Sequence, residues 1–360
     1  MEQFYCKTRI VSGSGAMDTL AELGSKRLFL VTDPFFVKNG TANKVMAAAG
    51  AAQAEVFDKV KPDPSVELVA EGTAALKAFA PDTVVALGGG SAMDCAKAMV
   101  YFSGKNVKMV AIPTTSGSGS EVTDFSILTH ADVKHPLVDE RLLPDVAILD
   151  SSLLEGLPPA LIADTGFDVL SHAAEAFVAT GAGTISDALA ADAFGAAFEH
   201  LPASFAGQKH VRLRIHTAAT MAAMAFSQAG LGLCHAMAHS LGGMFHVPHG
   251  RLNAILLPAV ISCNASLAQQ KYARLARSAG LGGGADTVAV RNLKNALIRL
   301  RKDLALPATL QQAGIDPGQL RSCMDAVIRA AVADPCCATN PVKVDAFVVR
   351  QVLEEVAGRG

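Results

Sequence analysis

The 360-residue sequence contains no tryptophan, only three tyrosines and no strong excess of either charge. Its 31 basic and 33 acidic residues give a formal net charge of −2. This balance excludes a nucleic-acid-binding protein or a membrane anchor that works through a basic surface. No stretch of about 18 apolar residues runs without polar interruption, so we expect no membrane-spanning helix and no membrane partner. The first residues, MEQFYCKTRIVSG, have no apolar signal core, so secretion is not expected.

Cysteine is also sparse, with seven residues and no Cys-x-x-Cys pair. The odd number and the wide spacing argue against a disulfide framework and against a cysteine zinc site. We therefore expect free thiols and a cytoplasmic protein. Hydrophobic residues make up 51% of the chain and charged residues 18%, which is typical of a globular protein, and the length suits about two domains.

The apolar pattern changes near residue 155 and divides the chain in two. In residues 1–155, short apolar runs alternate with stretches of helical spacing, which predicts a Rossmann-like α/β domain with a parallel sheet. In residues 156–360 almost every segment has helical spacing, which predicts an all-α domain. The expected strands are 28–32, 54–58, 83–87, 107–113 and 146–150, with 125–138 as a small antiparallel hairpin. The expected helices are 41–49, 65–79, 92–102, 161–178, 186–197, 212–226, 235–245, 252–264, 269–279, 288–304, 319–332 and 345–356.

Two loops rich in glycine and hydroxyl side chains each follow an expected strand. The first reads GGGS at 88–91 and opens a helix, and the second reads TTSGSGSEVT at 114–123. Glycines let the backbone approach an anion closely, and a helix N-terminus offers N–H groups with a partial positive charge. Because the carboxyl ends of parallel strands share one sheet edge, we expect both loops to lie where a dinucleotide pyrophosphate binds. The alternatives are a tight turn and a flexible loop that bind nothing.

Asp33 follows the expected strand at 28–32. A carboxylate at this position accepts hydrogen bonds from the adenosine ribose and repels a 2′-phosphate, which favours NAD over NADP. The alternative is an Asp-Pro turn formed with Pro34.

Four of the ten histidines fall within fifteen residues, in a segment that is otherwise apolar. His235 and His239 are four residues apart and share a helix face, and His246 and His249 follow. Asp168 and a second histidine show the same spacing on another apolar helix. Two helices that each present two such groups can hold a metal in a bundle core, and imidazoles with a carboxylate suit Fe(II) or zinc. Histidines that only form hydrogen bonds are the alternative. A dinucleotide loop beside a metal indicates hydride transfer.

These motifs, in this order, resemble those of the iron-containing (group III) alcohol dehydrogenases. The resemblance covers essentially the whole chain and is highly specific. It is carried by GGGSAMDCAKA at 88–98, IPTTSGSGSEVT at 112–123, LPDVAILD at 143–150, TGFDVLSHAAEA at 165–176, FSQAGLGLCHAMAHSLGG at 226–243 and PHGRLNAILLP at 248–258. It implies an N-terminal dinucleotide-binding domain, a helical C-terminal domain and an active site in the cleft between them.

The resemblance also implies roles for individual residues. The metal ligands, for Fe²⁺ or in some members Zn²⁺, would be Asp168, His172, His235 and His249. His239 would lie near the nicotinamide and relay a proton. The NAD(H) contacts would come from Gly89, Gly90, Ser91, Asp94, Thr114, Thr115, Ser118 and Lys134, in addition to Asp33. His246 has no role in the pattern, and we expect it beside the ligands.

Two residues depart from the family pattern. Ser118 replaces the usual threonine but keeps the hydroxyl, and Arg251 follows the PHG motif where an aliphatic residue is more usual. We expect Arg251 either to alter the substrate entrance or to pair with an acidic side chain.

Three stretches are most similar to the subgroup of 1-propanol dehydrogenases associated with propanediol-utilisation microcompartments. They are KHPL at 134–137, AFSQAGLGL at 225–233 and TNP at 339–341. This similarity implies propanal and 1-propanol as substrates, a homo-oligomer of two or more chains, and a location inside a bacterial microcompartment with shell or enzyme partners. The alternative function is a metal-dependent, non-redox enzyme such as a hydrolase or lyase on the same fold.

Overall fold

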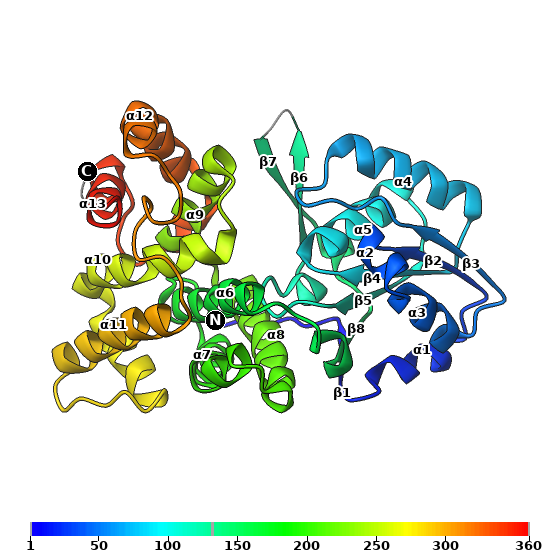
Figure 1. Ribbon diagram of the computed structural model, residues 1–360, viewed down its shortest axis with the longest axis horizontal. Coiled ribbons are helices and arrows are strands. Elements are labelled where there is room, and N and C mark those ends of the chain that lie inside the picture. The colour runs from blue at the N-terminus through cyan, green and yellow to red at the C-terminus, as the bar shows by residue number, and fades with distance from the viewer. Residues whose placement is uncertain (1, 131–132, 359–360) are drawn as a thin grey trace. The chain divides into compact units, whose positions relative to one another are not determined.

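The computed structural model describes residues 2–130 and 133–358 (Figure 1). The chain forms two compact units. The α/β unit is Cys6–Gly156, and the helical unit is Leu157–Gly360 together with Met1–Tyr5. The N-terminal residues join the helical unit through two polar contacts. Thr184 donates its backbone N–H to Glu2 Oε2 at 2.9 Å, and Tyr5 donates its own to Gln228 Oε1 at 3.3 Å.

The α/β unit is built on a six-stranded, fully parallel sheet in the order β1-β8-β5-β4-β2-β3. Its strands are β1 (Arg9–Gly13), β2 (Arg27–Val31), β3 (Gln53–Phe57), β4 (Thr83–Gly88), β5 (Lys108–Pro113) and β8 (Val146–Asp150). Its helices are α1 (Thr19–Glu22), α2 (Pro34–Lys38), α3 (Thr41–Ala49), α4 (Val66–Phe79) and α5 (Gly90–Ser103). From β2 the chain adds β3 on one side and then β4 on the other. The direction of winding therefore reverses between β2 and β4, where open α/β sheets bind their ligands.

Apolar side chains on both faces of the sheet explain why its central strands lack polar alternation. Residues that alternate along a strand enter two different cores. Phe29 and Val31 of β2 pack with α4 and α5, whereas Leu28 and Leu30 pack with α1 and α3. Figure 1 shows helices on both faces of the sheet. A separate antiparallel hairpin of β6 (Phe125–His130) and β7 (Val133–Val138) confirms the hairpin expected at 125–138.

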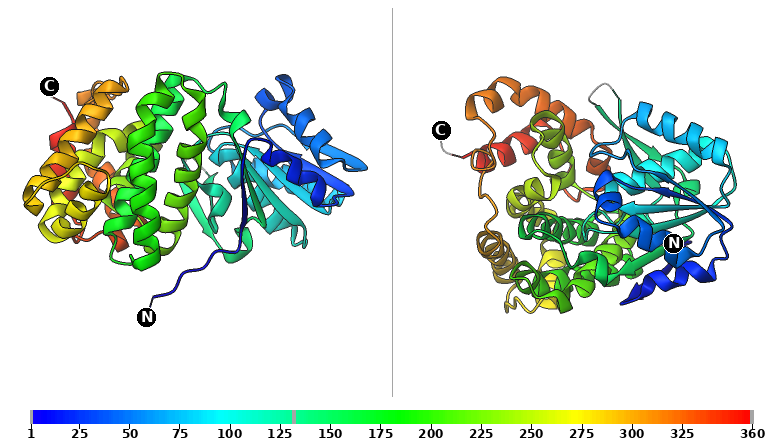
Figure 2. Two further views of the ribbon diagram at one scale, coloured as in Figure 1. Left: turned by 90° about the horizontal axis from the view of Figure 1, so that it is seen from below. Right: turned by 45° about the vertical axis from the view of Figure 1, so that its right-hand side comes forward.

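The helical unit confirms the predicted all-α segment. Its helices are α6 (Pro159–Val178), α7 (Thr184–Phe205), α8 (Arg212–Ala229), α9 (Leu233–Phe245), α10 (His249–Ser278), α11 (Asp286–Asp303), α12 (Pro317–Ala333) and α13 (Ala346–Val356). Helices α6, α7 and α8 pack against one another (Figure 2). Within the described residues, α10 alone is long and apolar enough to cross a membrane by length and composition. Its apolar window is 67% buried inside the unit, as in a core helix.

Candidate functional site

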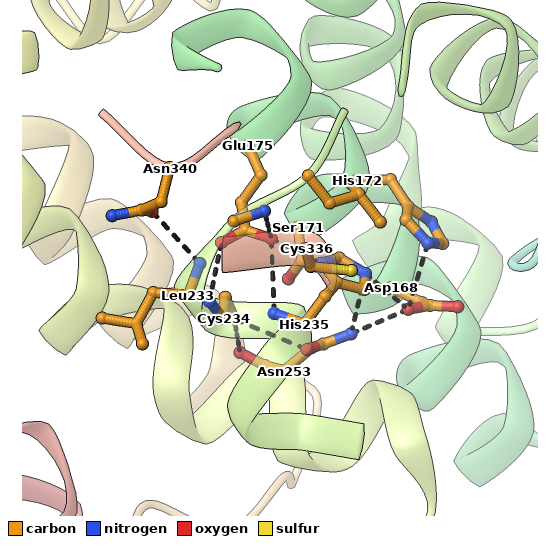
Figure 3. Close-up of polar contacts among 12 residues, drawn as sticks. Asp168, Ser171, His172, Glu175, Leu233, Cys234, His235, Asn253, Cys336 and Asn340 are labelled. Carbon is orange, nitrogen blue, oxygen red and sulfur yellow. Dashed lines mark hydrogen bonds and ion pairs between the residues drawn. The ribbon is translucent and has the colours of Figure 1, made fainter. Parts of the chain in front are cut away.

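Helix α6 presents three functional side chains on one face. Asp168, His172 and Glu175 follow one another at spacings of four and three residues, which stack on the same side of a helix. All three are buried, because α6 is covered by α7, α8 and α10. Buried acids and imidazoles need polar partners, and these come from the neighbouring helices (Figure 3).

Glu175 caps the N-terminus of α9. Its carboxylate accepts backbone N–H groups from Gly232 at 3.1 Å, Cys234 at 2.7 Å and His235 at 3.3 Å. The negative charge also suits the positive end of the helix dipole. Gly232 leaves room for this carboxylate, since a Cβ there would lie 2.8 Å from Glu175 Oε1 and 2.6 Å from Asn340 Oδ1. The start of α9 is therefore tied firmly to α6.

The same carboxylate orients the ring of His235. Glu175 Oε2 lies 2.6 Å from His235 Nδ1, so Nδ1 donates its proton and Nε2 turns toward Asp168. Burial lowers the pKa of His235, but the hydrogen bonds and charges of Asp168 and Glu175 outweigh it and raise the pKa to about 9. A carboxylate behind the ring is the usual support of a metal-binding histidine.

Three of the four expected metal ligands converge on one point. Donor atoms of Asp168, His235 and His249 all lie within 4.8 Å of one another. Asp168 Oδ1 is 3.5 Å from His249 Nε2, 3.7 Å from His235 Nε2 and 4.0 Å from His172 Nε2. His172 stacks on His235 with ring centroids 4.4 Å apart and on Phe226 at 4.5 Å, and these contacts hold it beside the other three.

These distances fit a shared cation. They exceed the roughly 2.7–3.2 Å of a protein hydrogen bond and approach the spacing of ligands that each lie about 2.1 Å from one ion. Burial raises the pKa of Asp168, but the imidazoles of His172, His249 and His235 outweigh it and hold the pKa well below its usual range. The site thus offers an ionised carboxylate and imidazoles without a thiolate, a donor set that suits Fe²⁺ and also accepts Zn²⁺.

Asn253 also lies inside this cluster. It is one helical turn after His249 on α10, and its Nδ2 donates to Asp168 Oδ1 at 2.8 Å. The same nitrogen lies 3.2 Å from His249 Nε2 and 3.3 Å from His235 Nε2. One amide nitrogen therefore lies against the three donor atoms that would surround a metal.

His239 faces a separate carboxylate. Its Nδ1 lies 2.9 Å from Asp334 Oδ2, and its ring stacks on that of His249 with centroids 5.1 Å apart. Burial raises the pKa of Asp334, but the hydrogen bond and charge of His239 and the N–H of Cys336 outweigh it and lower the pKa. An ionised Asp334 fixes the proton of His239 on Nδ1 and leaves Nε2 as the acceptor.

The structure brings the two glycine-rich loops together in the α/β unit. Gly88 has a φ of 151°, which favours glycine, and a Cβ there would lie 2.7 Å from Ala92 Cβ. Cβ atoms at Gly89 and Gly90 would lie 3.2 Å from Thr115 Oγ1 and 3.1 Å from Ser118 Oγ. The two loops therefore pack closely because Gly89 and Gly90 carry no side chains. The backbone of these two glycines stays partly exposed at the start of α5.

The remaining expected cofactor residues occupy different places. Asp33 caps α2 by accepting the N–H of Phe35 at 2.8 Å, and its Oδ2 lies 3.8 Å from where a Gly88 Cβ would be. Asp33 thus caps the helix that begins at Pro34. It also follows β2, where the direction of winding of the sheet reverses. Thr114 is buried and donates its N–H to Gly88 O at 2.9 Å, while Ser91 is partly exposed in the first turn of α5.

Asp94 and Lys134 already have partners in the protein. Asp94 accepts from Ser120 Oγ at 2.7 Å and from the N–H of Ile127 at 3.2 Å, which ties α5 to the second loop and to β6. Lys134 pairs with Asp63 at 2.7 Å on the half-exposed hairpin. Asp94 therefore supports the loop from within, and a contact of Lys134 with a cofactor would have to compete with Asp63.

The structure also shows where Arg251 and His246 lie, two residues to which the family pattern assigns no role. Arg251 forms a two-pronged ion pair with Asp164, with contacts of 3.1 and 2.9 Å, so it pairs with an acid on α6. His246 is exposed at the C-cap of α9 with a φ of 55°.

Sequence reasoning did not find Glu175, Asn253 and Asp334. For the first two a signal exists. Glu175 is an acid on an apolar helix three residues after His172, and Asn253 is a polar residue four residues after His249. Asp334 approaches His239 from a segment 95 residues away, and no local spacing predicts that contact.

Comparisons with known proteins find similarity along almost the whole chain. A family model described as iron-containing alcohol dehydrogenase matches residues 7–151, and one described as the C-terminal part of the Fe-containing alcohol dehydrogenase family matches residues 162–357. 1-Propanol dehydrogenase PduQ of Citrobacter freundii is 40% identical, over 99% of this chain and 100% of that protein. NADPH-dependent butanol dehydrogenase of Clostridium saccharobutylicum is 38% identical, over 98% of this chain and 97% of that protein.

A solved structure is similar over the full length. Sulfoacetaldehyde reductase of Bifidobacterium kashiwanohense in complex with NAD+ superposes with a TM-score of 0.90 and 28% identity, covering 100% of both chains. All three names describe oxidoreductases, so they give no support to the non-redox alternative.

Proposed function

Because this chain belongs to the iron-containing alcohol dehydrogenase family, we propose that it interconverts propanal and 1-propanol. It is an oxidoreductase, and its cofactors are NAD(H) and Fe²⁺. The single observation that carries the site assignment is the convergence of Asp168, His235 and His249 within 4.8 Å, beside His172. Identity of 40% with a 1-propanol dehydrogenase supports the substrate.

The four expected ligands hold the metal in this proposal. Asp168 supplies the negative charge, and the imidazoles of His172, His235 and His249 supply neutral nitrogens. When bound, Fe²⁺ would supply Lewis acidity for the substrate oxygen, and NAD(H) would supply the hydride chemistry. Glu175 fixes the tautomer of His235, and Asn253 restrains the Asp168 carboxylate.

His239 moves the proton in this proposal. Its Nδ1 hydrogen bond to Asp334 leaves Nε2 with a lone pair, which is the state a general base needs. When Nε2 takes a proton, the Asp334 carboxylate stabilises the imidazolium. The residues that hold the metal and the residue that moves the proton are therefore separate, although His235 and His239 both lie on α9.

The cofactor binds at the edge formed by the two glycine-rich loops in this proposal. Gly89, Gly90 and Ser91 would face the pyrophosphate at the start of α5, and Thr114, Thr115 and Ser118 would add hydroxyls from the second loop. Asp33 would face the adenosine ribose and favour NAD over NADP. Asp94 would act through the loop that it supports, and Lys134 would reach the cofactor after leaving Asp63.

The biological setting follows from the same similarity. We propose a homo-oligomer in the cytoplasm that enters a propanediol-utilisation microcompartment and contacts its shell or enzymes. Identity with the 1-propanol dehydrogenase of Citrobacter freundii supports this setting. Light scattering of the purified chain tests the oligomer, and fractionation of microcompartments tests the location.

The substrate is tested with protein loaded with Fe²⁺ without oxygen. Reduction of C2 to C5 aldehydes by NADH is followed by the loss of NADH absorbance. We expect the highest kcat/KM with propanal. A clearly higher kcat/KM for butanal or longer chains would overturn 1-propanol as the substrate, and failure with every aldehyde would overturn the activity.

A further inference from the structure

A second cluster of metal-binding groups lies beside the first. It consists of His239, Asp334 and Cys336, whose donor atoms all lie within 4.8 Å of one another. Within it, His239 Nδ1 lies 2.9 Å from Asp334 Oδ2, a hydrogen bond whose proton an ion bound to both atoms would replace. None of the three belongs to the four expected ligands of the iron centre.

The fold places these three groups before any ion arrives. Asp334 caps the short helix Pro335–Thr339, because its Oδ1 accepts the N–H of Cys336 at 2.8 Å. Oδ2 of the same carboxylate faces His239 on α9. The cluster is open enough for an ion to enter, since the His239 side chain is 37% exposed.

The donor set differs from that of the iron centre by its sulfur atom. One imidazole, one carboxylate and one thiolate suit Zn²⁺ and other borderline-soft ions, whereas the first centre has no sulfur ligand. A thiolate and a carboxylate together balance the charge of a divalent ion. Three protein ligands leave the fourth tetrahedral position for water.

We propose that His239, Asp334 and Cys336 form an inhibitory site for Zn²⁺ that is distinct from the iron centre. Binding replaces the thiol proton of Cys336, which is released to solvent. It also displaces the Nδ1 proton of His239, and the ring regains one proton at Nε2 to stay neutral. His239 then loses both its hydrogen bond to Asp334 and its free Nε2 lone pair, so it can no longer accept a proton. The inhibition rests on the proposed function of His239, whereas the metal binding does not.

The binding test uses Cd²⁺, which gives an ultraviolet sulfur-to-metal absorption band only when a thiolate coordinates it. The full chain, freshly reduced and without oxygen, is titrated with Cd²⁺. The iron centre has nitrogen and oxygen donors only, so Cd²⁺ bound there does not produce the band. Matched variants are Cys336→Ser, Cys337→Ser for the neighbouring thiol, and Cys234→Ser for the thiol 3.4 Å from Asn253 Oδ1. Circular dichroism checks that each variant is folded.

We expect the band in the wild type, in Cys337→Ser and in Cys234→Ser, and its loss in Cys336→Ser. His239→Ala should weaken Cd²⁺ binding at this site at least about tenfold. In a separate assay, Zn²⁺ should inhibit iron-loaded wild type at concentrations at least about tenfold lower than those that inhibit Cys336→Ser. A band that persists in folded Cys336→Ser, or that disappears in Cys234→Ser alone, would overturn the proposal. An inactive protein that still gives the expected bands would refute the proposed function and leave the metal site standing.

Discussion

Glu175 Oε2 lies 2.6 Å from His235 Nδ1 while the same carboxylate accepts three backbone N–H groups at the start of α9. One side chain therefore fixes both the position of the helix and the tautomer of His235, a proposed metal ligand. In the proposed metal centre, this contact between α6 and α9 would support the ligands from behind.

Replacing Glu175 by Gln should weaken metal binding by about 10- to 100-fold, because His235 loses the charge that orients it and raises its basicity. Affinity is measured by competition with a chelating indicator. Glu199→Gln, an exposed carboxylate on α7, is the control and should bind like the wild type. Equal affinities in the two variants would show that Glu175 supports the helix alone.

Metal affinity should rise with pH toward about 9. The raised pKa of His235 means that its imidazole holds an additional proton below this pH in the metal-free protein, and the metal must displace that proton. Affinity should therefore increase up to about tenfold per pH unit below 9 and level off above it. Isothermal titration at several pH values, with proton release followed in two buffers, checks the sign. An affinity that is constant between pH 6 and about 9 would contradict the assignment.

His239→Ala should keep the metal but lose turnover by about 10²- to 10⁴-fold, because it removes the general base. Asp334→Asn should cause a smaller loss of kcat and change its pH profile, since the base remains but loses its orienting charge. His210→Ala, an exposed histidine, is the control. Loss of metal from His239→Ala would show that this residue is a ligand.

Gly250→Ala should destabilise the helical unit by at least about 1–3 kcal/mol, because the new Cβ would lie 1.9 Å from the backbone oxygen of Asp164. The strain falls between His249 and the α6 turn that carries Asp168, so metal binding should weaken as well. Gly243→Ala is the matched control, since a Cβ at that position would have no described neighbour within 4 Å. It should change stability by no more than about 1 kcal/mol in thermal or urea unfolding.

Asp33→Ser separates the two roles of Asp33. Serine can still cap α2 but carries no charge, so the ratio of kcat/KM with NADP to that with NAD should rise by about tenfold or more, or roughly 1.4 kcal/mol. Asp33→Ala removes the cap as well and should also lower stability. If the ratio of kcat/KM with NADP to that with NAD is unchanged in Asp33→Ser, Asp33 acts only as the cap of α2 and does not select the cofactor.

The sequence predicts most elements because their signals are local. The helix expected at 41–49 coincides with α3, and Ser65 of the expected helix 65–79 is the N-cap of α4. Strand β1 is not among the expected strands, because RIVSG is short and only partly buried at the sheet edge. The helices expected at 252–264 and 269–279 both lie within α10, and non-helical dihedrals at Ala268 mark the kink where one helical stretch ends and the next begins. The expected break is therefore present, although the two stretches follow each other without a loop.

The site is predictable where its residues share a helix. Asp168 and His172, or His235 and His239, are found by their spacing of four residues. The pairing of Glu175 with His235, and of His239 with Asp334, joins segments 60 and 95 residues apart. Those contacts depend on how the helices pack, which no short pattern encodes.

The most direct test of the account measures iron and activity on the same sample. The wild type and Asp168→Asn are purified without oxygen, stripped with a chelator, incubated with Fe²⁺ and assayed for bound iron and for NADH oxidation with propanal. We predict one iron per wild-type chain, activity that disappears on chelation and returns with Fe²⁺, and neither tight iron nor activity in the variant. Full activity in the stripped wild type, or in the iron-free variant, would contradict the assignment of this centre to catalysis.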